Sequence, residues 1–222
     1  PSILPNLLKI ACNNINRSYK DLSLFELGPI FRDAENITPI QSVAGIRIGS
    51  NLPKNCHIPL QNVNIFDLKS DLEALFAYLG LDLDKCPIKS EAPNYYHPTR
   101  SGTVALGKNI LAYFGQLHPS ILKIFDIEYD VMAFEVELTQ LPIPKEKFGK
   151  RPVLEISDYQ PVTRDYAFII DESQKIGEIL SFIKNTDKNL IRSVNLFDIY
   201  SGDKIEKGKK SIAISVTIQD DN

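Results

Sequence analysis

Two histidines in this sequence could hold a metal ion or move a proton. His97 and His118 each precede a proline. Neither has a carboxylate or a cysteine at the spacing of a metal-ligand set, and two imidazoles alone do not make such a site. We therefore interpret both residues as turn formers at strand ends, and we predict no metal site.

Three cysteines could carry redox or metal chemistry, namely Cys12, Cys56 and Cys86. They are odd in number, far apart and outside any C-x-x-C spacing. This pattern predicts reduced thiols in a cytoplasmic protein, without a disulfide framework and without a zinc site.

Four lysines gather in a short segment between two predicted strands: Lys204, Lys207, Lys209 and Lys210. A lysine-rich turn can bind RNA phosphates, because each neutralised phosphate releases counterions. However, residues 151–222 contain ten Lys and Arg against twelve Asp and Glu, so this half is acidic overall. The residues alone leave two alternatives open, a phosphate contact or a solvated turn.

The composition excludes several classes of protein. The 222 residues carry a net charge of −3, which is not the charge of a protein that coats nucleic acid through bulk electrostatics. No apolar run approaches the ~18 residues of a membrane span, and the start shows no signal-peptide pattern. With 43% hydrophobic residues, the chain can bury a sizeable core.

The elements that would position these side chains fall into two parts. Residues 1–141 begin with an apolar helical stripe from Leu4 to Ile15, which we expect Ser2 to cap. A second helical stripe from Leu68 to Leu79 ends at Gly80. Strands are predicted at residues 22–31, 43–48, 103–106, 110–117 and 131–138, and they indicate an antiparallel sheet flanked by helices.

Residues 142–157 are predicted to be a linker, because prolines and a glycine stand among charged residues there. Residues 158–222 then show strand, helix, strand and strand at 165–170, 176–183, 194–200 and 212–219. This order is the beginning of a ferredoxin-like fold, which would continue with a helix and a fourth strand. We expect an incomplete domain whose last strand lacks a partner. Alternation puts Tyr166 and Phe168 on one face of the sheet and leaves open which face is exposed.

Three motifs in the second part resemble the ferredoxin-fold anticodon-binding domain of bacterial phenylalanyl-tRNA synthetase β subunits. They are residues 161–168 (PVTRDYAF), 196–202 (LFDIYSG) and 208–213 (GKKSIA). The first part resembles the synthetase-like module that precedes this domain, through residues 4–8 (LPNLL), 24–28 (LFELG), 66–69 (FDLK), 97–101 (HPTRS) and 115–119 (GQLHP). The resemblance covers nearly the whole chain and implies a C-terminal fragment that is truncated at both ends.

The motifs of an active class II synthetase are incomplete here. Residues 24–32 resemble motif 2, whose arginine holds the ATP α-phosphate, and Arg32 matches it. Ala34 stands where motif 2 has a glutamate, and residues 126–141 contain no arginine for motif 3. The resemblance thus implies a non-catalytic module, in which we expect Arg32 to be an ordinary surface or interface arginine.

The resemblance implies an α+β chain: a class II synthetase-like antiparallel sheet with flanking helices, then a truncated ferredoxin-like domain. It implies two partners, a catalytic α subunit in an α2β2 assembly and tRNA-Phe, and no DNA or membrane. ATP and Mg²⁺ would serve that holoenzyme, and this chain would bind no cofactor. The implied subunit contacts are His97 and Arg100, and the implied tRNA contacts are Arg164, Lys204, Lys207, Lys209 and Lys210.

Two other interpretations remain. A single-chain organellar-type phenylalanyl-tRNA synthetase also ends in this domain, but it needs intact motifs 2 and 3. A binding module unrelated to RNA could share the ferredoxin-like fold, because a fold alone does not fix a function.

Overall fold

The computed structural model describes residues 2–32, 38–83, 86–142 and 157–220. The chain divides into two compact units, Pro1–Phe148 and Gly149–Asn222, and each is described by itself. Most of the expected linker, residues 143–156, lies outside the described residues.

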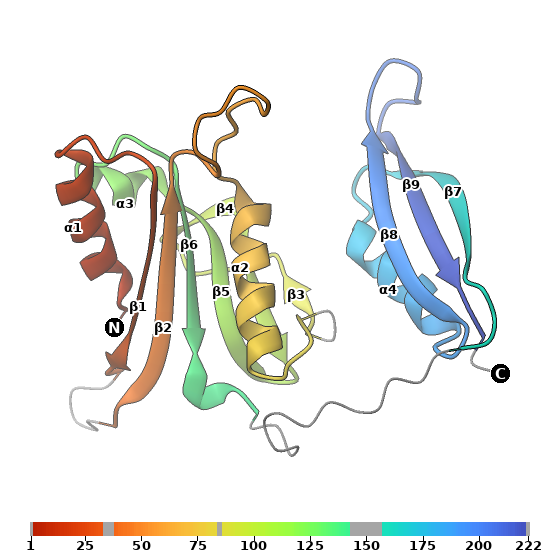
Figure 1. Ribbon diagram of the computed structural model, residues 1–222, viewed down its shortest axis with the longest axis horizontal. Helices are drawn as coiled ribbons and strands as arrows, with labels where there is room; N and C mark the ends of the chain where they lie inside the picture. Colours follow the sequence, from red (N-terminus) through yellow and green to blue (C-terminus); the bar gives the residue numbers. More distant parts are fainter. Residues whose placement is uncertain (1, 33–37, 84–85, 143–156, 221–222) are drawn as a thin grey trace. The chain divides into compact units, whose positions relative to one another are not determined.

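The first unit is a layered α+β structure built on an antiparallel sheet (Figure 1). Its described strands follow the spatial order β1-β2-β6-β5-β4-β3, and every neighbouring pair is antiparallel. The elements are α1 (Leu4–Ile15), β1 (Leu22–Ile30), β2 (Ile40–Ile48), α2 (Ile65–Tyr78), β3 (Ile88–Lys89), β4 (Tyr96–Leu106), β5 (Asn109–Leu117), α3 (Pro119–Ile124), β6 (Val131–Glu137) and the 3-10 helix η2 (Leu138–Gln140). The expected fold class is confirmed.

Helix α1 forms where its apolar stripe predicts it, and Pro5 lies in its first turn, where a missing N–H costs little. The expected cap is wrong, because the N-cap residue is Ile3, whose side chain makes no capping bond. Ser2 still accepts a hydrogen bond from the N–H of Leu4 (3.0 Å), while its hydroxyl donates to Glu135 of β6. Ser2 therefore joins the start of the helix to the sheet.

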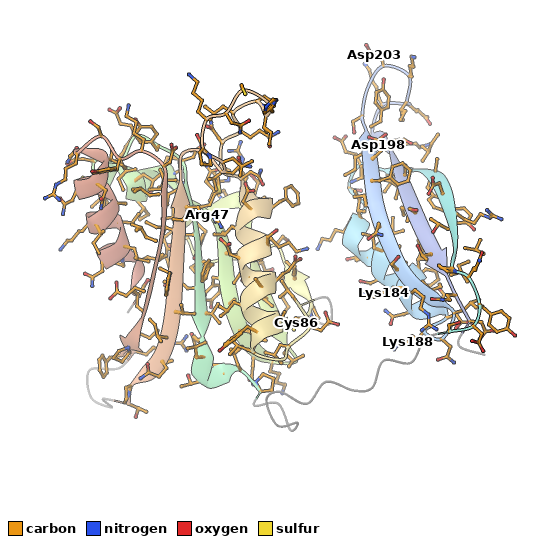
Figure 2. All side chains as sticks on the ribbon, in the orientation of Figure 1. Arg47, Cys86, Lys184, Lys188, Asp198 and Asp203 are labelled. Atoms are coloured by element: carbon orange, nitrogen blue, oxygen red, sulfur yellow. The ribbon has the colours of Figure 1, made fainter. Side chains whose placement is uncertain are left out.

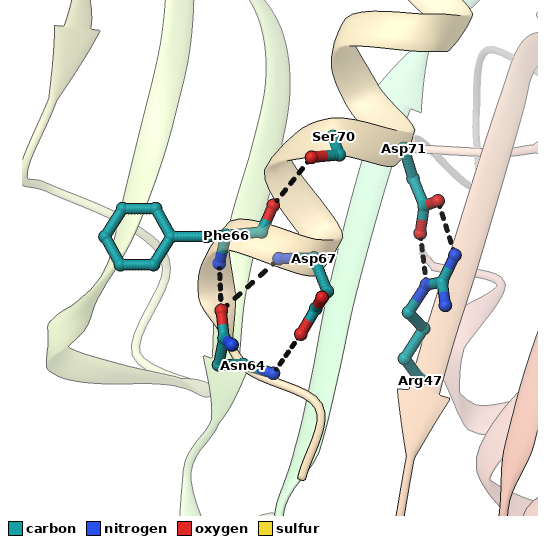
Figure 3. A network of polar contacts seen from close by, with 6 residues as sticks. All are labelled: Arg47, Asn64, Phe66, Asp67, Ser70 and Asp71. Carbon is teal, nitrogen blue, oxygen red and sulfur yellow. Dashed lines mark hydrogen bonds and ion pairs between the residues drawn. The ribbon is translucent and has the colours of Figure 1, made fainter. Parts of the chain in front are cut away.

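Helix α2 is fixed at its start and along its side (Figure 3). Asn64 and Asp67 form a capping box, in which each side chain accepts a hydrogen bond from the other residue's backbone N–H. Arg47 of β2 makes a two-point ion pair with Asp71, at 2.5 and 2.7 Å. Gly80, with a φ of +76°, follows the helix in the left-handed conformation typical of a C-terminal stop.

The two faces of this sheet carry separate cores. Helix α1 packs on one face against alternate residues of β2 and β6, including Ile46 and Ala133. Helix α2 packs on the other face against the residues between them, including Val43 and Phe134. This two-sided burial explains why β6 is buried along almost its whole length rather than at alternate residues.

The hairpin of β4 and β5 is longer than expected at its β4 end. The strand begins at Tyr96 rather than near Thr103, and its register with β5 shifts between Tyr96 and Ser101. Residues 97–100 therefore bulge opposite Gln116 alone. His97 lies inside this irregular stretch, whereas His118 follows β5 and caps α3.

The second unit has the expected order, with β7 (Val162–Asp171), α4 (Ile176–Thr186), β8 (Ile191–Tyr200) and β9 (Lys209–Ile218). Its sheet order is β7-β9-β8, with antiparallel pairs on both sides of β9. The expectation that the last strand lacks a partner is therefore wrong. Within the described residues, β7 has a free outer edge, because β9 inserts between β7 and β8.

Candidate nucleic-acid interface

One face of the second sheet is covered by a helix and the other is open. Helix α4 packs on Ile212, Ile214 and Val216 of β9, which are all buried. Alternation sends the odd-numbered residues of β9 to the opposite face, where no described helix lies. Figure 1 shows α4 on a single side of this sheet.

The open face consists of cross-strand rows that the pairing register defines. Reading from β7 through β9 to β8, the rows are Ile169–Ser211–Tyr200, Ala167–Ala213–Asp198, Asp165–Ser215–Asn195 and Thr163–Thr217–Ser193. Most members are small or carry a hydroxyl, a carboxylate or an amide. The face is therefore rich in hydrogen-bonding groups and accessible from solvent.

The first two rows combine groups suited to a nucleobase. Tyr200 exposes 43% of its surface beside the hydroxyl of Ser211, and Ile169 exposes 67%. Asp198 presents a carboxylate from the neighbouring row. An aromatic ring can stack on a base, and a carboxylate and a hydroxyl can take hydrogen bonds from its edge. Gly202 lies against Tyr200, since a Cβ there would meet the phenol oxygen at 2.6 Å.

The other face leaves two aromatic rings only partly covered. Tyr166 and Phe168 stack with their ring centroids 6.3 Å apart and expose 45% and 42% of their surfaces. They pair with Ile214 and Ile212, so they belong to the face on which α4 packs. The question that the sequence left open is thus answered, since Asp165 and Ala167 lie on the open face.

The four lysines lie at the end of the sheet where β8 turns into β9, but their environments differ. Lys204 and Lys207 lie exposed in the turn. Lys209 makes an ion pair with Glu206 (2.7 Å), which raises the pKa of the lysine and lowers the pKa of the carboxyl group. Lys210 donates to the carbonyl oxygens of Glu172 and Gln174, at 2.8 and 3.0 Å.

Arg164 does not join these lysines. It pairs with Val216 on the face that α4 covers, whereas Lys210 pairs with Ile170 at the other end of β7. Ile170 lies six residues along the strand from Arg164, a distance of roughly 20 Å. The five predicted tRNA contacts therefore do not form one patch, and the lysine turn borders the row of Tyr200 without Arg164.

In the first unit, the arginine matched to motif 2 has an internal partner. Arg32 makes an ion pair with Glu137 at the end of β6, and Glu137 is 9% exposed. Arg32 itself is exposed, so it remains compatible with the expected surface or interface arginine. Beside this pair lies a pocket of about 70 Å³, far below the roughly 300–1,000 Å³ of ordinary ligand pockets.

A tyrosine–carboxylate network borders that pocket, which Tyr95 and Glu135 help to line. Glu135 accepts hydrogen bonds from Tyr95 (2.8 Å) and Tyr96 (3.4 Å). Burial, together with the Glu135 charge, raises the pKa of both phenols, so they stay protonated donors. Together with the hydroxyl of Ser2, these phenols supply the carboxylate of Glu135 with hydrogen-bond donors from within the chain.

The predicted subunit contacts lie near the start of β4. The ring centroids of His97 and His118 are 6.5 Å apart, and Arg100 donates to the side-chain oxygen of Gln116 at 2.8 Å. No group of three or more metal-ligating side chains forms among the residues that the structure describes. No helix in those residues is long and apolar enough to cross a membrane.

Comparison with known proteins assigns both units to described domains. Residues 1–138 match the phenylalanyl tRNA synthetase beta chain CLM domain, and residues 157–222 match the ferredoxin-fold anticodon binding domain. The chain belongs to the phenylalanyl-tRNA synthetase β-chain family.

Relatives in this family align with the whole chain. The β subunit of phenylalanine–tRNA ligase from Rickettsia bellii is 54% identical over 223 residues, and that from Rickettsia prowazekii is 50% identical over 224, each covering 100% of this chain. The subunit from Rhodospirillum rubrum is 39% identical over 99% of the chain. The chain spans 25%, 27% and 28% of these relatives, about a quarter of their length.

Among solved structures, a pyrrolysyl-tRNA synthetase from Desulfitobacterium hafniense aligns with 62% of this chain and 46% of its own. The identity is 15% and the TM-score 0.46. A likeness this distant supports no argument about function.

In this member of the β-chain family, two residues of the candidate nucleic-acid interface are not predicted from the sequence. The motif at residues 196–202 was identified, yet Asp198 and Tyr200 were not assigned a role. Their spacing of two residues was a usable signal that both side chains lie on the same face of the strand. The sequence did not reveal that this face is the open one.

Proposed function

We propose that this chain is the anticodon-region-binding part of the β subunit of an ATP-dependent phenylalanine–tRNA ligase. The observation that carries the proposal is the row of Tyr200 and Ser211 with Asp198 beside it on the open face. The description of the matched second domain as anticodon-binding supports it. In this proposal a base of tRNA-Phe stacks on Tyr200, and Asp198 accepts hydrogen bonds from its edge.

The backbone of the RNA would pass the adjacent turn. Lys204 and Lys207 extend from that turn, next to the row of Tyr200. Two cations suffice for a local contact, whereas the acidic remainder of the domain discourages non-specific binding. Arg164, on the other face, does not contribute in this arrangement.

The first unit would serve assembly rather than chemistry. Glu137 already neutralises Arg32, and the pocket beside the pair has no room for a nucleotide. We propose that a catalytic α subunit uses ATP and Mg²⁺ in an α2β2 enzyme, and that this cytoplasmic chain contributes no catalytic residue and binds no cofactor. The names of the relatives, which are β subunits, support this interpretation over a single-chain enzyme.

A matched pair of tyrosines tests the proposed RNA-binding face. Tyr200→Ala and Tyr166→Ala remove rings of similar exposure, 43% and 45%, from opposite faces of one sheet. Loss of a stacked base costs about 1–3 kcal/mol, which raises Kd about 5- to 150-fold. Fluorescence titration of the chain with a tRNA-Phe anticodon stem-loop should show this rise for Tyr200→Ala and little change for Tyr166→Ala.

The reverse pattern would place the RNA on the α4 side of the sheet and refute the proposed face. A stem-loop in which the anticodon bases are replaced by abasic residues provides a second control. It should bind the wild-type chain as weakly as the natural stem-loop binds Tyr200→Ala. Equal binding of both stem-loops by the wild type would contradict base recognition altogether.

A further inference from the structure

Two histidines that are 21 residues apart in the sequence lie side by side at one end of the β4–β5 hairpin. The start of β4 pairs with the end of β5 through Tyr96 and Leu117, and the N–H of His118 donates to the carbonyl of Tyr95 (2.8 Å). This pairing brings the ring centroids of His97 and His118 to 6.5 Å, with their planes tilted by 31°. The two rings therefore form one local surface.

Local hydrogen bonds fix which nitrogen of each ring carries the proton. The N–H of Thr99 donates to Nδ1 of His97 (3.3 Å), and the N–H of Ser120 donates to Nδ1 of His118 (3.2 Å). The hydroxyls of Thr99 and Ser120 also lie 3.3 and 2.7 Å from these nitrogens, and their roles depend on the tautomer. The backbone N–H donors require a lone pair on Nδ1 and so favour the tautomer with the proton on Nε2. Neither Nε2–H has a partner among the described residues, so the two rings present two donors.

Arg100 extends this cluster of donors. Its guanidinium donates to Oε1 of Gln116 (2.8 Å), and Nε2 of Gln116 in turn donates to Asp130 (2.7 Å). Gln116 is 3% exposed, and its amide joins Arg100 on one side to the carboxylate of Asp130 on the other. Gln116 and His118 flank Leu117, so alternation puts them on the same side, with their Cα atoms about 7 Å apart.

We propose that His97, Arg100 and His118 form a docking site for a carboxylate side chain of the catalytic subunit. This proposal rests on the proposed function, which supplies that partner, and adds the chemistry of the contact. The cluster offers donors, and a carboxylate offers two acceptor oxygens for a guanidinium and an imidazole N–H. Arg100 carries the single formal charge of this cluster, fewer than the two lysines of the proposed RNA contact, so the cluster favours one carboxylate over an RNA backbone.

The experiment distinguishes the acceptor role of Nδ1 from the donor role of Nε2 in each ring. In the full-length β subunit, His97→Asn with His118→Asn keeps an acceptor near the position of Nδ1 and removes the Nε2–H donors. His97→Gln with His118→Gln keeps an amide donor near the position of Nε2 instead. Replacing the exposed third histidine, His57→Asn, is the matched control.

Association of each variant with the catalytic subunit is measured by sedimentation or by a labelled titration. The asparagine pair should weaken association about tenfold or more while the thermal melting of the free β subunit stays unchanged. The glutamine pair should associate more tightly than the asparagine pair, and His57→Asn should match the wild type. These three results together support a donor site for a carboxylate.

Wild-type association of the asparagine pair would overturn the proposal. Unchanged association with weaker tRNA binding would overturn it too, and would identify a phosphate contact instead. If the wild-type subunits do not associate at all, the proposed function itself fails, which separates that failure from a failure of the docking site.

Discussion

The lysine turn of the second unit allows a quantitative prediction, because the structure divides its four cations into two classes. Lys209 is paired with Glu206, and Lys210 is bound to two carbonyl oxygens. Lys204 and Lys207 have no hydrogen-bond or ion-pair partner among the described residues and extend into solvent. Replacing Lys204 and Lys207 by alanine should therefore remove the cations that are available to RNA.

The magnitude follows from counterion release. Each phosphate contact contributes about 0.7 to the slope of log K against log salt for a single strand and about 0.9 for a duplex. Two contacts give a difference of about 1.4–1.8 between the wild type and the double variant. Between ~50 and ~200 mM salt, the affinity advantage of the wild type should shrink about seven- to twelvefold.

The assay is a titration of a tRNA-Phe anticodon stem-loop at four or more salt concentrations. Lys184→Ala with Lys188→Ala removes the same charge from the end of the unit that lies away from Asp203 and the turn (Figure 2), so it controls for net charge. Lys210→Ala should leave the salt slope near that of the wild type and loosen the turn before α4. Equal slopes for the Lys204/Lys207 variant and the wild type would refute the reasoning.

Three further outcomes are expected from the fold. Asn64→Ala should lower the free energy of unfolding of the first unit by about 1 kcal/mol in urea titration, because it removes the cap of α2, while Asn64→Asp should not. Amides of β9 should exchange with deuterium more slowly than those on the free edge of β7, and equal rates would contradict the central position of β9. Iodoacetamide should modify exposed Cys56 well before Cys86, whose pKa is raised by burial and by Asp82, and mass spectrometry of the peptides would show the reverse order if this is wrong.

The helices were the most predictable part of this fold. The stripes of α1, α2 and α4 each repeat over three or four turns, so the apolar face is specified several times within one segment. Short elements such as α3 and β3 lack this redundancy and were missed. Their conformations depend on partners distant in sequence, for example the pairing of Ile88 with Val104.

The candidate site was predictable in its residue types but not in its arrangement. The sequence pointed to the lysine turn and to His97 with Arg100, yet it could not show that Lys209 and Lys210 are engaged within the domain. It also could not place His118 beside His97, because that contact depends on the register of β4 with β5. Partners within the fold decide which side chains remain available to a ligand.

The open face itself depends on one irregularity in β8. Val194 and Leu196 pair with Val216 and Ile214 on the buried face, so simple alternation would send Asp198 and Tyr200 to that face as well. The register shifts between Leu196 and Asp198, because Phe197 is an extra residue in the strand. A shift of one residue reverses the face of every side chain that follows. The bulge at Phe197 therefore turns Asp198 and Tyr200 onto the open face, where they can meet a nucleobase instead of packing under α4.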